Sequence, residues 1–254
     1  MSGRAVLIEP IGGASGNMLL GAFLDAGLTS EQVESWLRPL QLGHWRLMVE
    51  RAQKHEIRAV YADYAVDSAG PSLSLAEVTE KVGKFPLSPA VVSQADSVLR
   101  KLAGARERSS GQPPDEQLYS AAEAIDLMLD VVGFCCIVEH YQLEAVYCRP
   151  LPIAFGAGHH GRPHPRPLLT ELTCGIPIRP IENAEETVTV TGAAILSTCA
   201  RFHLPGLVTP EAVGYGCGRS DFAFPNVCRI QLLQVEPKAD FEGALASGEC
   251  QFRS

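Results

Sequence analysis

One long helical segment is apolar on nearly every side, and this feature constrains the fold more than any other. The helical pattern spans residues 117–141, and its second half reads MLDVVGFCCIVEHY. A helix that is hydrophobic all round is buried, because no face of it suits water. The chain is therefore expected to fold around this helix, with other elements packed on most of its sides.

Strand-like and helix-like segments alternate on both sides of that helix. Short apolar runs predict strands at 5–9, 45–51, 57–66, 145–148, 176–182 and 227–235, and the polar turn AQKHE joins the second and third in a β-hairpin. Helical patterns cover 18–27, 31–37, 75–82, 89–106, 168–173 and 191–203. Residues 106–116, 149–167 and 213–226 are rich in glycine, proline or polar residues and are predicted as loops. The alternation predicts an α/β fold: a mixed sheet with flanking helices and a buried central helix.

Composition limits the domain organisation and the class of partner. With 254 residues and 46% hydrophobic content, residues 1–236 are expected to form a single domain, or two close lobes hinged near 107–114, before a flexible tail at 237–254. The net charge of -8 argues against nucleic acid as a partner. No apolar run is long enough for a membrane span, and the first residues do not form a secretion signal. A cytoplasmic protein is expected.

The eight cysteines carry no recognisable site. None of them is spaced as C-x-x-C, so the sequence favours neither a zinc knuckle nor a redox pair. Most lie in apolar stretches, where cysteine behaves as a small buried hydrophobe. We therefore expect free, buried thiols.

Three loops of small residues are candidate anion sites. The first leads from a strand into a helix N-terminus, whose N–H groups and dipole attract anions, although it matches neither a Walker A loop nor G-x-G-x-x-G. A tight turn that only packs the helix on the strand is the equally weighted alternative. The candidate ligand-binding residues are Gly12, Gly13, Ser15, Gly16 and Asn17 in the first loop, Thr189, Thr191 and Gly192 in the second, and Gly216 and Gly218, followed by Arg219, in the third.

Three carboxylates lie on one face of the long helix. Glu123, Asp126 and Asp130 are spaced i, i+3 and i+7. A solvated stripe is the simpler interpretation for Glu123, whereas Asp126 and Asp130 have apolar neighbours. Carboxylates in such surroundings are costly unless they are paired or bind a cation, and magnesium or manganese suits them.

The loop GAGHHGRPHPRP carries the histidines His159, His160 and His164. Imidazole suits nickel, zinc, copper or iron. One loop seldom supplies a complete metal site, so a second source of ligands is needed, and a polar surface loop is the alternative interpretation.

The order of these segments resembles the LarC-type nickel-insertion proteins, which load nickel into the pyridinium bis-thiocarboxylate mononucleotide cofactor of lactate racemase. The family's D-C-F-S-G-I-S-G-D-M-like opening corresponds to EPIGGASGNM, its V-D-S-I-V-D-I-V-G helix to IDLMLDVVG, and its T-P-T-G-A-A loop to TVTGAA. Its P-L-P and H-G elements are also present, as are G-Y-G-x-G and P-N-V. The similarity covers nearly the whole chain.

The resemblance implies a function and a set of site residues. It implies that the chain binds a phosphorylated pyridinium mononucleotide at the loop 12–17 and inserts nickel into it, as a lyase-class nickel insertase. Asp126, Asp130 and His160 are then the catalytic and metal-binding residues, with magnesium or manganese as a further metal used with a nucleotide. Family members carry a second, nucleotide-binding domain, so a separately encoded domain is an expected partner, as is a homo-oligomer.

Departures from the family pattern support an alternative. Asn17 replaces an acidic residue, and the family's H-F-H-E run is here LYSA, at 118–121. Loss of histidine and glutamate ligands weakens a transition-metal site. The alternative is a non-catalytic paralogue that partners an intact insertase. A hydrolase acting through Asp126 and Asp130 ranks last, because no nucleophile accompanies them.

Overall fold

A mixed sheet of seven strands forms one layer of the fold. The computed structural model describes residues 3–67, 70–156, 164–182, 185–203 and 208–235. The sheet contains β1 (Gly3–Pro10), β2 (Trp45–Lys54), β3 (Ile57–Val66), β6 (Leu143–Cys148), β9 (Ala200–Arg201), β10 (Val208–Cys217) and β11 (Val227–Val235), in the order β2-β3-β10-β11-β1-β6-β9. The pairs β1–β6, β6–β9 and β3–β10 are parallel and the others antiparallel, which confirms the predicted mixed sheet.

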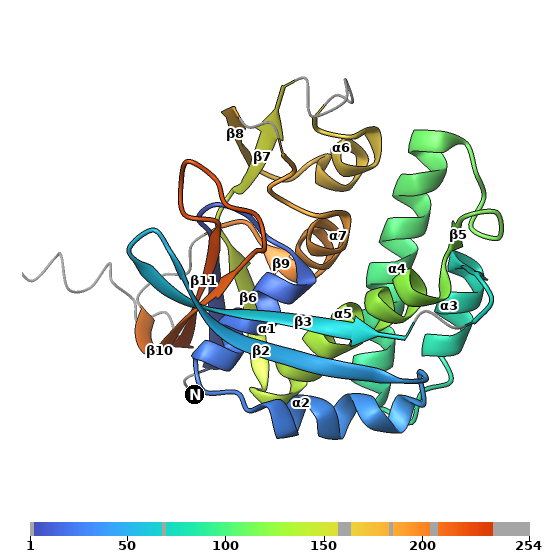
Figure 1. Cartoon of the computed structure of the whole chain (residues 1–254), viewed down its shortest axis with the longest axis horizontal. Coiled ribbons are helices and arrows are strands. Elements are labelled where there is room, and N and C mark those ends of the chain that lie inside the picture. The colour runs from blue at the N-terminus through green and yellow to red at the C-terminus, as the bar shows by residue number, and fades with distance from the viewer. Residues whose placement is uncertain (1–2, 68–69, 157–163, 183–184, 204–207, 236–254) are drawn as a thin grey trace, which may run out of the picture.

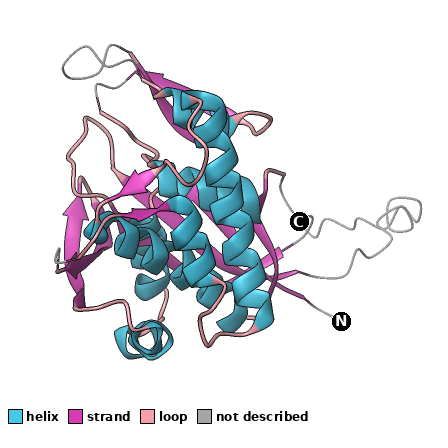
Figure 2. Ribbon diagram, turned by 90° about the vertical axis from the view of Figure 1, so that its right-hand side faces the viewer, coloured by secondary structure: helices cyan, strands magenta, loops and turns pink. Residues whose placement is uncertain are grey.

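The helices form the second layer, in front of the strands in the view of Figure 2. They are α1 (Gly16–Asp25), α2 (Ser30–Leu37), α3 (Leu75–Val82), α4 (Pro89–Ser110), α5 (Ala121–His140), α6 (Pro167–Thr173) and α7 (Val190–Cys199), with a short 3₁₀ turn, η1 (Arg38–Leu40), after α2. Two small sheets complete the fold: β4 (Leu73–Ser74) with β5 (Leu118–Tyr119), and β7 (Leu151–Phe155) with β8 (Ile178–Glu182). The smaller apolar clusters on the other face of the main sheet come from strands and a loop rather than from helices.

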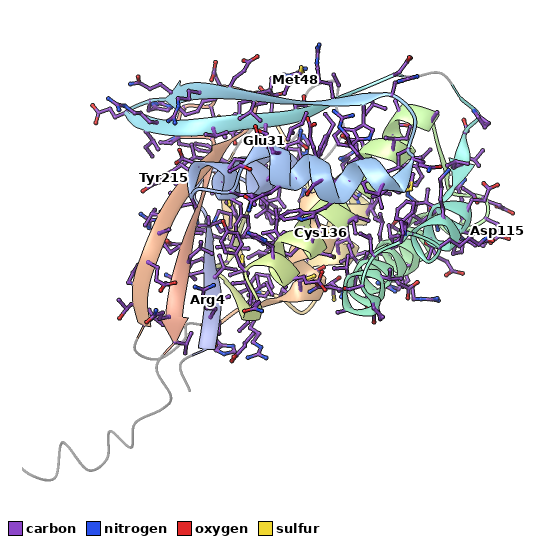
Figure 3. All side chains as sticks on the ribbon, turned by 90° about the horizontal axis from the view of Figure 1, so that it is seen from below. Arg4, Glu31, Met48, Asp115, Cys136 and Tyr215 are labelled. Atoms are coloured by element: carbon purple, nitrogen blue, oxygen red, sulfur yellow. The ribbon has the colours of Figure 1, made fainter. Side chains whose placement is uncertain are left out.

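Helix α5 is the predicted central helix. Its side chains Met128, Leu129 and Ile137 are fully buried, and the labelled Cys136 lies in the interior in Figure 3. The helix begins at Ala121 rather than at residue 117, because β5 pairs with β4 just before it. Ser120 and Glu123 close its N-terminus in a capping box.

Two segments predicted as loops are strands. Strand β10 includes residues 213–217 of the predicted loop 213–226, and β7 lies within the predicted loop 149–167. The glycines that suggested a loop in β10 serve a different purpose. A Cβ on Gly214 would lie 2.0 Å from the carbonyl oxygen of Ala22, and one on Gly216 would lie 1.8 Å from that of Met18. Glycine therefore lets α1 pack directly on the strand, as glycine within strands often does.

Other boundaries also differ from the predictions. Helix α4 continues to Ser110, so the expected hinge at 107–114 begins inside its last turn. Helix α7 ends at Cys199 instead of His203, because β9 follows it and pairs with β6. The predicted tail, 237–254, lies outside the described residues. In the described part of the chain, no helix has the length and apolar character needed to cross a membrane.

The cysteines largely follow the prediction. All seven in the described ranges are free, and five of them are buried. Cys174 is exposed and Cys199 half-buried, so the expectation of burial is wrong for these two. Burial raises the pKa of the Cys228 thiol to about 12, which keeps it protonated and unreactive.

Candidate functional site

Two of the predicted loops meet at one corner of the sheet. The N–H of Ala14 donates to the carbonyl of Thr187 at 3.0 Å, and the N–H of Thr189 donates to the carbonyl of Ala14 at 2.9 Å. This pairing brings the N-termini of α1 and α7 together (Figure 1). The hydroxyls of Ser15 and Thr189 accept hydrogen bonds from the N–H groups of Met18 and Gly192, so both cap their own helix. Thr191 lies in the first turn of α7.

The glycines of this corner are sites of close packing. A Cβ on Gly12 or Gly13 would lie 2.0 or 2.2 Å from a backbone carbonyl oxygen, and one on Gly192 would lie 2.6 Å from another. Gly218 is similarly close to the side chain of Asn226, at 2.6 Å. The packing interpretation therefore accounts for these residues, and anion binding by them stays a prediction.

Asp130 of α5 is buried directly behind the start of α1. Its side chain is 7% exposed, and its Oδ2 would lie 2.0 Å from a Cβ on Gly16, so only glycine fits there. Its Oδ1 has no hydrogen-bond partner among the described residues. A cavity of about 10 Å³, lined in part by Gly16, Tyr64 and Asp130, lies beside it and is large enough for about one water molecule. A buried carboxyl group with an unpaired oxygen is costly, so it calls for a proton or a cation.

Asp126 lies one turn before Asp130 on the same helix and is half-buried. Burial, followed by the charge of Asp63, raises its pKa to about 6. Burial, followed by the charges of Asp126 and Asp63, raises the pKa of Asp130 well above its ordinary value. Since neither carboxylate has an ion pair or a side-chain hydrogen bond within the described ranges, the two form an uncompensated acidic pair.

Asp63 of β3 is a member of this site that the sequence analysis missed. Its Oδ1 accepts hydrogen bonds from the Asn17 amide at 2.6 Å and from the N–H of Tyr64 at 2.9 Å. Its Oδ2 accepts from the Tyr61 hydroxyl at 2.6 Å and from Arg219 at 3.1 Å. Asn17 and Arg219 were predicted as ligand-binding residues, and here both bind Asp63. An acidic residue in the apolar run YADYAV was the signal available in the sequence.

The other side chains considered as metal ligands do not join Asp126 and Asp130 in the described part of the structure. Glu123 is exposed, as its simpler interpretation predicted, and in addition it caps α5. His164 contacts Gly156 through its backbone, and its Nδ1 is buried without a partner among the described residues. His159 and His160 lie outside the described residues. Across the described ranges, no three histidine, cysteine or acidic side chains are arranged to hold a metal ion.

Glu9, the other acidic position of the opening motif, lies at the end of β1 and is fully paired. Arg229 donates two hydrogen bonds to its carboxylate, at 2.7 and 2.9 Å, and Gln231 donates a third at 2.7 Å. Burial alone would raise the pKa of Glu9, but these bonds and the charges of Arg229 and Arg149 lower it overall. Arg229 and Gln231 therefore keep Glu9 in its ionised form.

Comparison with known proteins identifies related chains. The family model described as "Nickel insertion protein" matches residues 6–250. A "Putative nickel insertion protein" of Dictyoglomus thermophilum is 32% identical over 91% of this chain and 61% of its own length. Another from Thermomicrobium roseum is 35% identical over 89% of this chain and 57% of its own length. A "Pyridinium-3,5-bisthiocarboxylic acid mononucleotide nickel insertion protein" of Staphylococcus epidermidis is 27% identical over 98% of this chain and 63% of its own.

The match is nearly complete for this chain and partial for its relatives. The chain spans about three fifths of the length of the curated relatives named above. No solved structure matches it. Because the family model matches nearly the whole chain, the chain belongs to the nickel insertion protein family.

Proposed function

We propose that this chain holds Ni²⁺ at the Asp126–Asp130 pair and takes part in inserting it into a pyridinium bis-thiocarboxylate mononucleotide. The relatives' names supply the substrate class. The observation that carries the site assignment is the buried Oδ1 of Asp130, which has no hydrogen-bond partner among the described residues, beside a half-buried Asp126. Such a pair is neutralised by protons or by a divalent cation. Nickel is here the substrate that is transferred.

Carboxylate ligands suit a metal that has to leave. Nickel binds nitrogen and sulfur donors more tightly than it binds carboxylate oxygens. A site made of two carboxylates would therefore hold Ni²⁺ weakly enough for the two thiocarboxylate groups of the substrate to remove it. His160, which comes between β7 and α6 in the sequence, is proposed as a further ligand during this transfer. Magnesium or manganese at the same pair is the alternative, since both prefer oxygen ligands.

The neighbouring helix N-termini are proposed to hold the phosphate of the mononucleotide. The start of α1 touches Asp130 through Gly16, so an anion bound there would lie close to the metal pair. Because the hydroxyls of Ser15 and Thr189 already cap their helices, backbone N–H groups would make most of the contacts. We propose that a further, nucleotide-binding domain takes part in the reaction; the curated relatives extend well beyond the region that this chain matches.

Nickel binding tests the assignment. Purified chain is dialysed to equilibrium against Ni²⁺ and the bound metal is measured at a known free Ni²⁺ concentration, and the affinity is measured by calorimetry with Mn²⁺ and Mg²⁺ as comparison metals. We expect one Ni²⁺ per chain, lost in Asp126→Asn and in Asp130→Asn. Glu123→Gln, on the same helix, is the matched control and should bind as the wild type does, since glutamine also completes a capping box.

Two results would contradict the proposal. If the wild type binds no nickel, alone or with the pyridinium mononucleotide present, the non-catalytic paralogue becomes the better interpretation. If nickel binds equally to the wild type and both aspartate variants, the metal site lies elsewhere in the chain. Preference for Mn²⁺ or Mg²⁺ over Ni²⁺ at the pair would assign it to a resident metal rather than to the transferred one.

A further inference from the structure

A single exposed arginine lies against the acidic site. Arg219 donates from Nη2 to Asp63 at 3.1 Å and from Nε to the Tyr61 hydroxyl at 3.2 Å. Its side chain is 79% exposed, whereas that of Asp63 is 20% exposed. Lys54 donates to the backbone carbonyl of Arg219 at 3.1 Å, so the backbone is anchored while the side chain extends into solvent. Within the described ranges, Arg219 is the only basic side chain bonded to Asp63.

Asp63 lies between Arg219 and the Asp126–Asp130 pair, and the first turn of α1 contacts both sides. Asn17 in this turn donates to Asp63, and the preceding Gly16 is in contact with the carboxyl group of Asp130. Tyr64, the neighbour of Asp63 in β3, lines the same cavity as Asp130. Asp63 and Asp130 therefore contact adjacent residues, Asn17 and Gly16, so the guanidinium of Arg219 lies within electrostatic reach of a cation bound to the Asp126–Asp130 pair.

The unpaired Oδ1 of Asp130 shows that Arg219 does not satisfy the whole cluster. Arg219 neutralises the outer carboxylate, Asp63, while Asp130 stays buried without a partner in the described part of the chain. An exposed ion pair contributes little to stability, so breaking it costs little. A divalent cation at the pair would repel the guanidinium and so weaken this contact.

We propose that Arg219 is a removable counter-ion of the acidic cluster: a divalent cation at Asp126 and Asp130 displaces it from Asp63, and the freed guanidinium then binds an anionic group of the substrate. This rests on the proposed function. Cation and anion binding then become cooperative. The cation breaks the contact between Arg219 and Asp63 that would otherwise compete with the anion, and the anion binds the guanidinium that would otherwise repel the cation. Guanidinium is suited to the task, since it binds carboxylates and phosphates through two parallel hydrogen bonds.

Charge substitutions at Arg219 test the first half of the proposal. We expect Arg219→Gln to bind Ni²⁺ at least about fivefold more tightly than the wild type in the absence of anions, the low end of ordinary coupling between sites. Arg219→Lys keeps the charge and should stay close to the wild type. Arg58→Gln, at an exposed arginine on β3, the strand of Asp63, is the matched control for net charge and should change the affinity less than twofold, because salt screens distant surface charges.

Anion binding tests the second half. Thermal melts are recorded with inorganic phosphate and with benzene-1,3-dicarboxylate, which imitate the phosphate and the paired acid groups of the substrate, each with and without Ni²⁺. At least one anion should stabilise the wild type only when Ni²⁺ is present, and should fail to do so in Arg219→Gln. The anion that responds identifies the group that Arg219 receives.

The outcomes separate this proposal from the one on which it rests. Unchanged or weaker Ni²⁺ binding by Arg219→Gln, or equal anion stabilisation of wild type and variant, overturns the role of Arg219 while nickel binding itself stands. Absence of nickel binding in the wild type overturns both proposals.

Discussion

Glu9 and the Asp126–Asp130 pair are all partly or wholly buried carboxylic acids, but their pKa values shift in opposite directions. At Glu9, Arg229 and Gln231 supply three hydrogen bonds, and the pKa falls below its ordinary value. At the pair, no described side chain supplies a countercharge, and burial raises the pKa of Asp126 to about 6. Burial alone therefore does not mark a functional carboxylate. A buried carboxylate without a protein partner is the better indicator of function, because its charge must be balanced by a proton or by a bound ligand.

The two regions should also respond to pH in opposite directions. Glu9 has a lowered pKa in the folded state, so its stabilising effect is present above about pH 4.5 and is lost as the pH falls through its folded value. Asp126 has a raised pKa, so the folded state holds a proton that the unfolded chain has already lost. The stabilising effect of that proton is complete below about pH 3.8 and is lost as the pH rises to about 6.

The largest expected effect comes from unpairing Glu9. Arg229→Met leaves the Glu9 carboxylate partly buried with one of its donors gone, and should lower the free energy of unfolding by about 2–3 kcal/mol. Loss of one partner from a fully buried pair costs about 3–5 kcal/mol, and partial contact with water reduces that cost here. Urea unfolding at pH 7.5 measures it. The double variant Glu9→Gln/Arg229→Met should regain part of the loss, and no recovery would contradict the idea that a stranded charge is the cause.

Removing the charge of Asp126 should change the free energy of unfolding in the opposite direction. Asp126→Asn should raise the free energy of unfolding at pH 7.5 by about 2 kcal/mol, because the folded state no longer has to hold an ionised carboxylate in a partly buried position. The fall in stability between about pH 4 and 6 should become shallower for the same reason. Unfolding curves across this range provide the measurement. Destabilisation instead of stabilisation would mean that Asp126 has a protein partner, and the contrast with Glu9 would then fail.

The smallest effect is expected at the third carboxylate of α5. The exposed Glu123 carboxylate accepts hydrogen bonds from the N–H and the hydroxyl of Ser120, so Glu123→Gln keeps the capping box and should change stability by less than about 0.5 kcal/mol. Thermal melts in parallel with Asp126→Asn check this on the same helix. A change as large as that of Asp126→Asn would show that position on the helix, and not burial, determines the response.

The hydrophobic pattern was sufficient for most of the elements. Helix α5, the β2–β3 hairpin and strand β11 follow from runs of apolar residues and from capping and turn residues that act within a few positions of the chain. The two missed strands show where such reasoning ends. Gly214 and Gly216 suggest a loop unless α1 is known to lie against them, and the prolines around β7 hide a strand that is defined by its pairing with β8.

The candidate site divides in the same way. The placing of Asp126 and Asp130 on one face of a buried helix follows from the sequence alone, because helical spacing is a local property. The contact of Asp130 with Gly16, the place of Asp63 in the cluster and the pairing of Glu9 with Arg229 arise from the folding of the chain. These contacts join residues far apart in the chain, and the partner that a carboxylate finds across the fold sets its charge state. No local pattern contains that information.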